Sequence, residues 1–317
     1  MKPSSKLVIY VAAALAVLAL IVGVVMYGLP KGAGEGGLWV VLLFPGMQDD
    51  VRRILADDDF LYVVGLGADP HEVQLTPRDV EVLKSANLIV SMGHTHVDKQ
   101  VENLVRKGDI KARFINIPYI KGLIIPKLPG EDRYNYHELY YDPRNLEIVL
   151  SEIVKVLGEL RPEKKGYYEE KLVEVKKEID EIKEYADYMK GCKVIIASAE
   201  LQPAIQWLGP EIIWYVVYEY AEAPSPDRIG AAIKAMESGD KDKIVVVIGL
   251  ADHHHHNHQN HGHHHHTFMS KLDERLRDEA KSRGLKVFGV RTGYVGDSVI
   301  EGLKDVIEHL KMKNIRC

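Results

Sequence analysis

Histidine is the residue type in this chain with the most evident chemistry. Fifteen histidines occur among 317 residues, and ten of them lie within the fourteen positions from 253 to 266. Imidazoles that are mostly unprotonated at neutral pH offer weak, exchangeable sites for zinc, nickel, cobalt or copper. The alternative is a purification tag, but tags are unbroken runs at a terminus, and this run is internal. It predicts a low-affinity metal-collecting loop that contains His253, His254, His255, His256, His258, His261, His263, His264, His265 and His266.

Four other residues lie where an α/β sheet usually collects its ligands, at the carboxyl ends of parallel strands. They are His71 after strand 61–66, His137 before the long helices, Glu200 after strand 193–197 and Asp297 after strand 286–290. Two imidazoles and two carboxylates satisfy a four-coordinate divalent ion. A single His or Asp in a loop is more often a surface or capping group, and for Asp297 the alternative role is a helix N-cap.

A second histidine pair lies on the same predicted edge. His94 and His96 directly follow the strand that ends at Met92. One of them could replace His137 as a ligand, or the pair could lie outside the coordination sphere, along the entry route of an ion. Two solvated loop histidines are the third possibility.

Alternating strands and helices predict an α/β fold with two doubly wound, parallel-sheet lobes. The first lobe is predicted at 38–142, and a helical linker rich in Glu and Lys at 143–190, broken at Arg161-Pro162. The second lobe is predicted at 191–317, with the His-rich loop at 253–266. The expected strands are 38–44, 61–66, 88–92, 114–117, 193–197, 213–217, 244–248 and 286–290. The expected helices are 49–55, 77–85, 97–107, 163–189, 227–237, 268–283 and 298–311, and Thr76 is the expected N-cap before Pro77.

Composition narrows the class of protein. With 46% hydrophobic and 27% charged residues the chain has material for a packed core, which argues against disorder. A net charge of -5 gives no sign of a nucleic-acid partner. We expect a monomer. Cys192 and Cys317 form no Cys-x-x-Cys motif, so they are either one disulfide of an exported protein or two inert thiols.

The N-terminus has the properties of a membrane segment. Residues 7–29 carry no charge and exceed the roughly 20 residues that a spanning helix needs. Lys2 and Lys6 precede them, which favours a cytoplasmic N-terminus and an exported remainder. We therefore predict a transmembrane anchor or signal segment at 1–30, with the uncleaved anchor favoured, and a flexible Gly-rich linker at 31–37.

The segments around these candidate ligands resemble the metal-binding subgroup of ABC transporter solute receptors. The most specific match is Gly67-Ala68-Asp69-Pro70-His71-Glu72, followed by Thr76-Pro77-Arg78-Asp79-Val80. Tyr136-His137-Glu138-Leu139 is similar to the second-ligand segment, although its usual Trp is missing. Glu222-Ala223-Pro224-Ser225-Pro226 and Gly296-Asp297-Ser298 also match, and the resemblance covers nearly all of residues 38–317.

The resemblance implies two α/β lobes joined by a long helix, and four metal ligands. His71 is the first of them, His137 the second, Glu200 the third and Asp297 the fourth. Glu at the third position is typical of manganese receptors. A His-rich loop is common among the zinc receptors, although there it usually lies in the first lobe.

We therefore expect an extracytoplasmic receptor, and not an enzyme, that delivers a divalent metal to an ABC permease and its cytoplasmic ATPase. The histidine run favours Zn²⁺, and two carboxylates keep Mn²⁺ or iron as the alternative. A metal-dependent hydrolase is the competing class. No His-Glu-x-x-His or Gly-x-Ser-x-Gly motif supports it.

Overall fold

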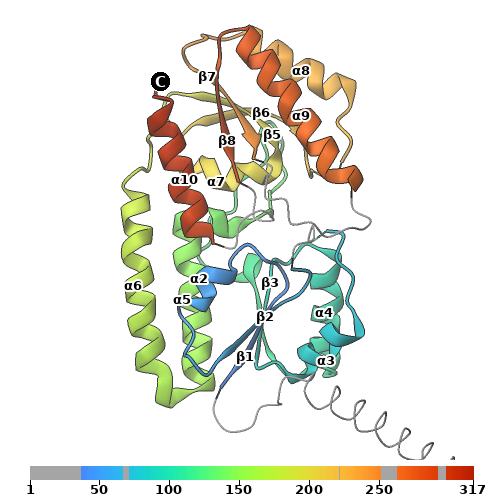
Figure 1. Ribbon diagram of the computed structural model, residues 1–317, viewed down its shortest axis with the longest axis vertical. Helices are drawn as coiled ribbons and strands as arrows, with labels where there is room; N and C mark the ends of the chain where they lie inside the picture. Colours follow the sequence, from blue (N-terminus) through green and yellow to red (C-terminus); the bar gives the residue numbers. More distant parts are fainter. Residues whose placement is uncertain (1–36, 67–70, 221, 251–262, 292–297) are drawn as a thin grey trace, which may run out of the picture. The chain divides into compact units, whose positions relative to one another are not determined.

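The computed structural model describes residues 37–66, 71–220, 222–250, 263–291 and 298–317, without the side chains of 263–270. Two four-stranded sheets, both parallel, form the framework (Figure 1). The predicted fold class of two parallel-sheet lobes is thus confirmed.

The first sheet has the strand order β2-β1-β3-β4. Its elements are β1 (Trp39–Leu42), α2 (Gln48–Arg52), β2 (Phe60–Val63), α3 (Pro77–Ser85), β3 (Leu88–Ser91), α4 (His96–Lys107) and β4 (Arg113–Asn116). Helix α3 begins where its sequence predicts, because Thr76 before Pro77 and Asp79 after it form a capping box. The strands β1, β2 and β3 are shorter than predicted, because their hydrophobic runs continue beyond the last paired residue.

The second sheet repeats this arrangement in the order β6-β5-β7-β8. Its elements are β5 (Lys193–Ser198), α7 (Gln202–Gln206), β6 (Glu211–Val217), α8 (Pro226–Glu237), β7 (Ile244–Gly249), α9 (His263–Ser282), β8 (Lys286–Val290) and α10 (Val299–Met312). The short helix α7 was not predicted. Helix α9 begins at His263, so the last four histidines of the run belong to its first turns.

Two helices connect the sheets, with a break at the predicted Arg161-Pro162, whereas the resemblance implied a single long helix. Helix α5 (Pro143–Leu160) is followed by the short turn Pro162–Lys164 and by α6 (Lys165–Lys183), which lies beside it (Figure 1). The predicted helix 163–189 ends early, because the chain turns after Lys183 and Asp187 takes a left-handed φ of 63°.

Two hydrophobic clusters form the core, and one of them extends through both lobes. Side chains of β1 alternate between its faces: Trp39 and Val41 pack with α3 and α4, whereas Val40 and Leu42 join the cluster that includes α5. That second cluster continues through α6 into β5 and β7 of the other sheet. The disulfide left open above does form. Cys192 pairs with Cys317 at a Cα–Cα distance of 5.1 Å.

The predicted N-terminal anchor at 1–30 and all but the last residue of the predicted linker 31–37 lie outside the described residues. Among the helices that the structure describes, none has the length and apolar character needed to cross a membrane.

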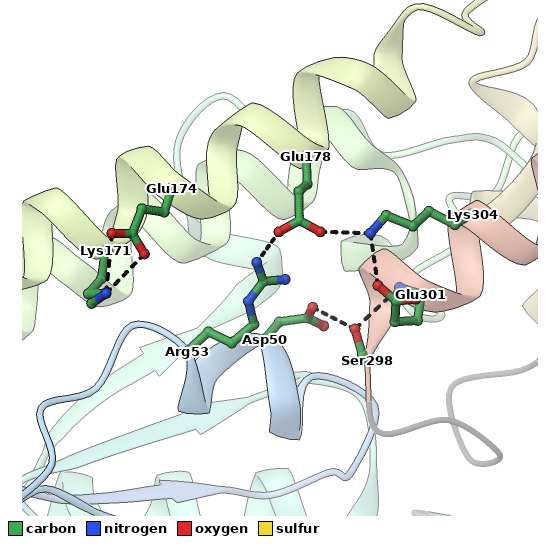
Figure 2. A network of polar contacts seen from close by, with 8 residues as sticks. All are labelled: Asp50, Arg53, Lys171, Glu174, Glu178, Ser298, Glu301 and Lys304. Atoms are coloured by element: carbon green, nitrogen blue, oxygen red, sulfur yellow. Dashed lines mark hydrogen bonds and ion pairs between the residues drawn. The ribbon is translucent and has the colours of Figure 1, made fainter.

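A polar network joins α2 to the N-terminus of α10 (Figure 2). Asp50 is fully buried, and its carboxylate accepts hydrogen bonds from Ser298 Oγ at 2.8 Å and from the Val299 amide at 2.6 Å. Beside it, Arg53 pairs with Glu178 of α6, which also binds Lys304 of α10 at 2.7 Å. Burial raises the pKa of Asp50 to about 6, although Ser298, the α10 amides and Arg53 oppose the shift.

We predict that Asp50→Asn flattens the pH dependence of stability between pH 4 and pH 7. The folded-state pKa of about 6 exceeds the usual 3.8, so the native protein holds its proton more tightly than the unfolded chain. The free energy of unfolding therefore falls as pH rises through this window, by roughly 2 kcal/mol. An asparagine still accepts from Val299 and donates to Ser298, but does not titrate. Urea unfolding at both pH values measures the difference; equal slopes for variant and wild type would contradict the prediction.

Candidate metal centre

Three histidines converge at the carboxyl edge of the first sheet. His71 lies between β2 and α3, His94 follows β3, and His137 precedes α5. One ring nitrogen from each lies within 4.8 Å of the other two. The ring centroids are 5.0 Å apart for His94 and His137, and 5.2 Å for His71 and His94. This is the one group of at least three potential metal ligands found among the described residues.

His94 is held in place by the turn after β3. Gly93 adopts a φ of 84°, and a Cβ there would lie 2.1 Å from Asn116 Oδ1, so the close approach requires glycine. The buried carboxylate of Asp98 then accepts from the backbone amides of His94 at 3.1 Å and of Thr95 at 2.9 Å. Thr95 and Asp98 also form the capping box of α4, so the start of this helix fixes the backbone of His94.

His137 is the most buried of the three, with 1% of its surface exposed. Its Nδ1 lies 2.8 Å from Asn135 Oδ1, and its ring packs edge-on against Tyr218 at 4.5 Å between centroids. Its Nε2 is directed toward the second lobe, where it meets a carboxylate.

That carboxylate belongs to Glu219, which follows β6. One of its oxygens lies 3.5 Å from His137 Nε2, and the other lies 3.9 Å from His71 Nδ1. Contact with His137 holds the pKa of Glu219 below its ordinary value, against the opposing effect of burial. Glu219 is thus an anion beside two of the three imidazoles, supplied by the other lobe.

Two of the three histidines, His94 and His137, are neutral at physiological pH. Burial lowers the pKa of His94 to about 3, and the neighbouring His137 and His71 act in the same direction. Burial also lowers the pKa of His137, although Glu219 opposes this shift. Neutral imidazoles keep a lone pair for a cation, so the centre can bind a metal ion without first losing protons from these two rings.

The other residues predicted as metal ligands are not found in the three-histidine group. Glu200 is buried and accepts a hydrogen bond from the Tyr220 amide at 3.0 Å, and it is not part of the three-histidine group. His96 is exposed in the first turn of α4. Asp297 and the histidines from His253 to His261 lie outside the described residues, and the side chains of His263, His264, His265 and His266 are not described.

Sequence reasoning missed Glu219. The signal was present, because Glu219 comes directly after the predicted strand 213–217, two positions past its end. The strand-end rule that selected Glu200 applies to it equally. The local sequence cannot tell which of these two glutamates faces the histidines.

Comparisons with known proteins find relatives whose descriptions concern metal uptake. The family described as "Zinc-uptake complex component A periplasmic" (ZnuA) matches residues 40–246. The metal ABC transporter substrate-binding lipoprotein SloC of Streptococcus mutans is 25% identical over 244 residues, which cover 70% of this chain and 76% of SloC.

Solved structures share the fold at low sequence identity. A mutant of the laminin-binding adhesin of Streptococcus agalactiae is 19% identical with a TM-score of 0.64, over 87% of this chain and 99% of that one. FpvC of Pseudomonas aeruginosa in complex with Mn²⁺ is 16% identical with a TM-score of 0.66, over 88% and 98% of the two chains. A crystal structure of ZnuA is 17% identical with a TM-score of 0.63, over 88% and 99%. Because the family match spans both lobes and most of the strands, this chain belongs to the ZnuA family of metal-binding receptors of ABC transporters, which are not enzymes.

Proposed function

We propose that this protein is an extracytoplasmic receptor that binds Zn²⁺ with His71, His94, His137 and Glu219, and delivers it to an ABC permease and its ATPase. The observation that carries the proposal is the convergence of three imidazole nitrogens within 4.8 Å. Around one zinc ion with Zn–N bonds of about 2.0–2.1 Å, tetrahedral nitrogens are about 3.3 Å apart. Binding of the ion would draw the three nitrogens together from their present spacing of up to 4.8 Å.

The position of Glu219 supports a cation in this place. Its oxygen lies 3.5 Å from Nε2 of His137, a ring that burial keeps neutral. A carboxylate beside an imidazole lone pair is favourable only with a proton or a metal ion between them. Three nitrogens and one carboxylate also suit zinc better than manganese, which prefers oxygen ligands.

Manganese is the second candidate. FpvC, of the same fold, is described in complex with Mn²⁺. A site that used Glu200 and Asp297 with only two histidines would have the oxygen-rich character that this ion favours. The set with three histidines predicts a preference for Zn²⁺, and the set with two carboxylates predicts a preference for Mn²⁺.

We expect calorimetry of chelator-stripped protein to show one tight Zn²⁺ site, with Mn²⁺ bound much more weakly. The His-rich loop complicates the titration because it adds weak sites, so a variant without residues 253–262 is titrated alongside. Helix α9 begins at His263, and this deletion leaves it intact. Stoichiometry should fall in the variant while the tight affinity stays the same.

Two results would count against the proposal. Tighter binding of Mn²⁺ than of Zn²⁺ would favour the oxygen-rich set. Loss of the tight site in the deletion variant would make the loop itself a ligand source, and would remove its proposed role as a reservoir of weakly bound zinc.

Glutamate substitutions separate the two ligand sets. We expect Glu219→Gln to weaken Zn²⁺ binding at least about tenfold, because a neutral amide replaces the charge beside His71 and His137. Glu200→Gln is the matched control. It keeps an oxygen for the Tyr220 amide and should leave the affinity nearly unchanged. The reverse outcome in competition titrations would make Glu200 the ligand from the second lobe.

The proposed location is the outer face of a membrane, with residues 1–30 as the anchor. The support is the uncharged segment 7–29 after Lys2 and Lys6, together with the description of SloC as a lipoprotein. Membrane fractionation and N-terminal sequencing test this; a soluble protein that begins beyond residue 30 would indicate a cleaved signal peptide.

A further inference from the structure

Asn135 is not a candidate metal ligand, yet its side chain makes four polar contacts beside the metal centre. Asn135 is fully buried, and each end of its amide contacts two groups. Oδ1 accepts from the His137 amide at 3.1 Å and lies 2.8 Å from His137 Nδ1. Nδ2 donates to the Ala199 carbonyl at 2.8 Å and to Gln202 Oε1 at 2.9 Å.

Two backbone groups determine the orientation of this amide. The N–H of His137 can only donate, and the carbonyl of Ala199 can only accept. In a flipped Asn135 the NH₂ group would face the N–H of His137, and the oxygen would face the Ala199 carbonyl. Its oxygen therefore faces His137, and Nδ1 of that ring must carry the proton. In the neutral ring the lone pair is then on Nε2, the nitrogen that lies 3.5 Å from Glu219.

The partners of Asn135 come from both lobes. His137 belongs to the segment before α5, whereas Ala199 and Gln202 follow β5. Gln202 also donates to the Lys127 carbonyl at 2.7 Å, so it binds both ends of the hairpin 126–135. Within this hairpin the Leu128 amide donates to the Arg133 carbonyl and the Asn135 amide to the Pro126 carbonyl, each at 2.8 Å.

The rest of the hairpin packs on β6. The Arg133 guanidinium lies 4.4 Å from the centre of the Tyr218 ring, which in turn packs against His137. Glu131 accepts a hydrogen bond from Tyr215. The hairpin that leads into His137 is thus attached to the strand that leads into Glu219, and the two candidate ligands are positioned by one set of contacts.

We propose that Asn135 is a positioning residue that selects the Nδ1–H tautomer of His137, and that makes metal binding by this ring depend on docking of the hairpin 126–135 against the second lobe. The inference rests on the proposed function for the identity of the ion. The orientation of the ring is a property of the metal-free protein.

Histidine-selective ¹⁵N NMR of the metal-free full chain tests the first part of the proposal, the tautomer of His137. We expect His137, assigned by the signal lost in His137→Gln, to show a protonated Nδ1 and an unprotonated Nε2. In Asn135→Leu the fixed tautomer should be lost, and Zn²⁺ affinity should fall about 10–100-fold, as for other groups that orient a metal ligand. A protonated Nε2 in the wild type overturns the proposal, even if Asn135→Leu does not fold.

Gln202→Met tests the second half, because it leaves the contact between Asn135 and His137 in place but removes the bonds to the hairpin. We expect an unchanged tautomer and a smaller loss of Zn²⁺ affinity; unchanged affinity would disprove the coupling. Asn87→Leu is the control. Asn87 accepts from the Trp39 amide at 2.7 Å at the other end of the first sheet, so its loss should lower the melting temperature without altering affinity. If the wild type shows the expected tautomer but binds no zinc tightly, the proposed function fails and the orientation of His137 stands.

Discussion

Substitution of His94 by alanine is expected to weaken Zn²⁺ binding more than about 100-fold. Loss of a group that only orients a ligand typically costs about 10–100-fold, and removal of a ligand itself should exceed this. The fold should survive, because the backbone of His94 is held by Asp98 and not by the imidazole. Competition with a chelator of known affinity measures the change on protein that lacks residues 253–262.

The chain offers a matched control for this experiment. His96 lies two positions away, exposed on the first turn of α4, and its ring is not part of the three-histidine group. His96→Ala should bind Zn²⁺ as the wild type does. Equal affinity in both variants would show that His94 is not a ligand. Asp297, which lies outside the described residues, would then be the candidate for the fourth ligand.

Removal of the disulfide is expected to lower the free energy of unfolding of the second lobe by about 4–5 kcal/mol. Cys192 and Cys317 are 125 residues apart, and the bond between them closes nearly the whole lobe into a loop. A disulfide that closes so long a loop strongly reduces the conformational entropy of the unfolded chain. The expected loss of about 4–5 kcal/mol is the value for a loop on the order of 100 residues. Guanidinium unfolding of the double variant Cys192→Ala/Cys317→Ala measures the effect.

Alanine is the better replacement because Cys192 is fully buried, and a serine hydroxyl there would add a separate desolvation penalty. Wild-type protein in dithiothreitol should lose a similar amount. Zinc affinity is the internal control, since the native lobe keeps its structure. A loss of less than about 1 kcal/mol would show that the bond does not form in the purified protein.

The elements were largely predictable because their signals are local. Apolar strands that alternate with amphipathic helices indicate parallel sheets whatever the rest of the chain does. The start of α3 at Pro77 follows from Thr76 and Asp79 alone, through bonds between neighbours in sequence. The break between α5 and α6 was predicted at Arg161-Pro162. The end of α6 was less predictable, because the periodic Glu- and Lys-rich pattern continues beyond Lys183 while the chain turns.

The site was predictable only in part. His71 and His137 were selected, and the structure brings them together, but their role as ligands is still a prediction. His94 was considered as an alternative to His137, whereas the geometry places both beside His71. Nothing in the local sequence states that three loops far apart in the chain meet at one point.

By itself, the sequence determined the fold class, the helix starts that depend on local caps, and the strand ends at which ligands had to be sought. Tertiary structure alone decided which strand-end residues face one another. Glu200 and Glu219 follow the neighbouring strands β5 and β6, yet one is buried against the Tyr220 amide and the other reaches His71 and His137. The reason is physical: the periodicity of a strand fixes which face a side chain takes, whereas the direction of the loop after the strand depends on packing against the opposite lobe.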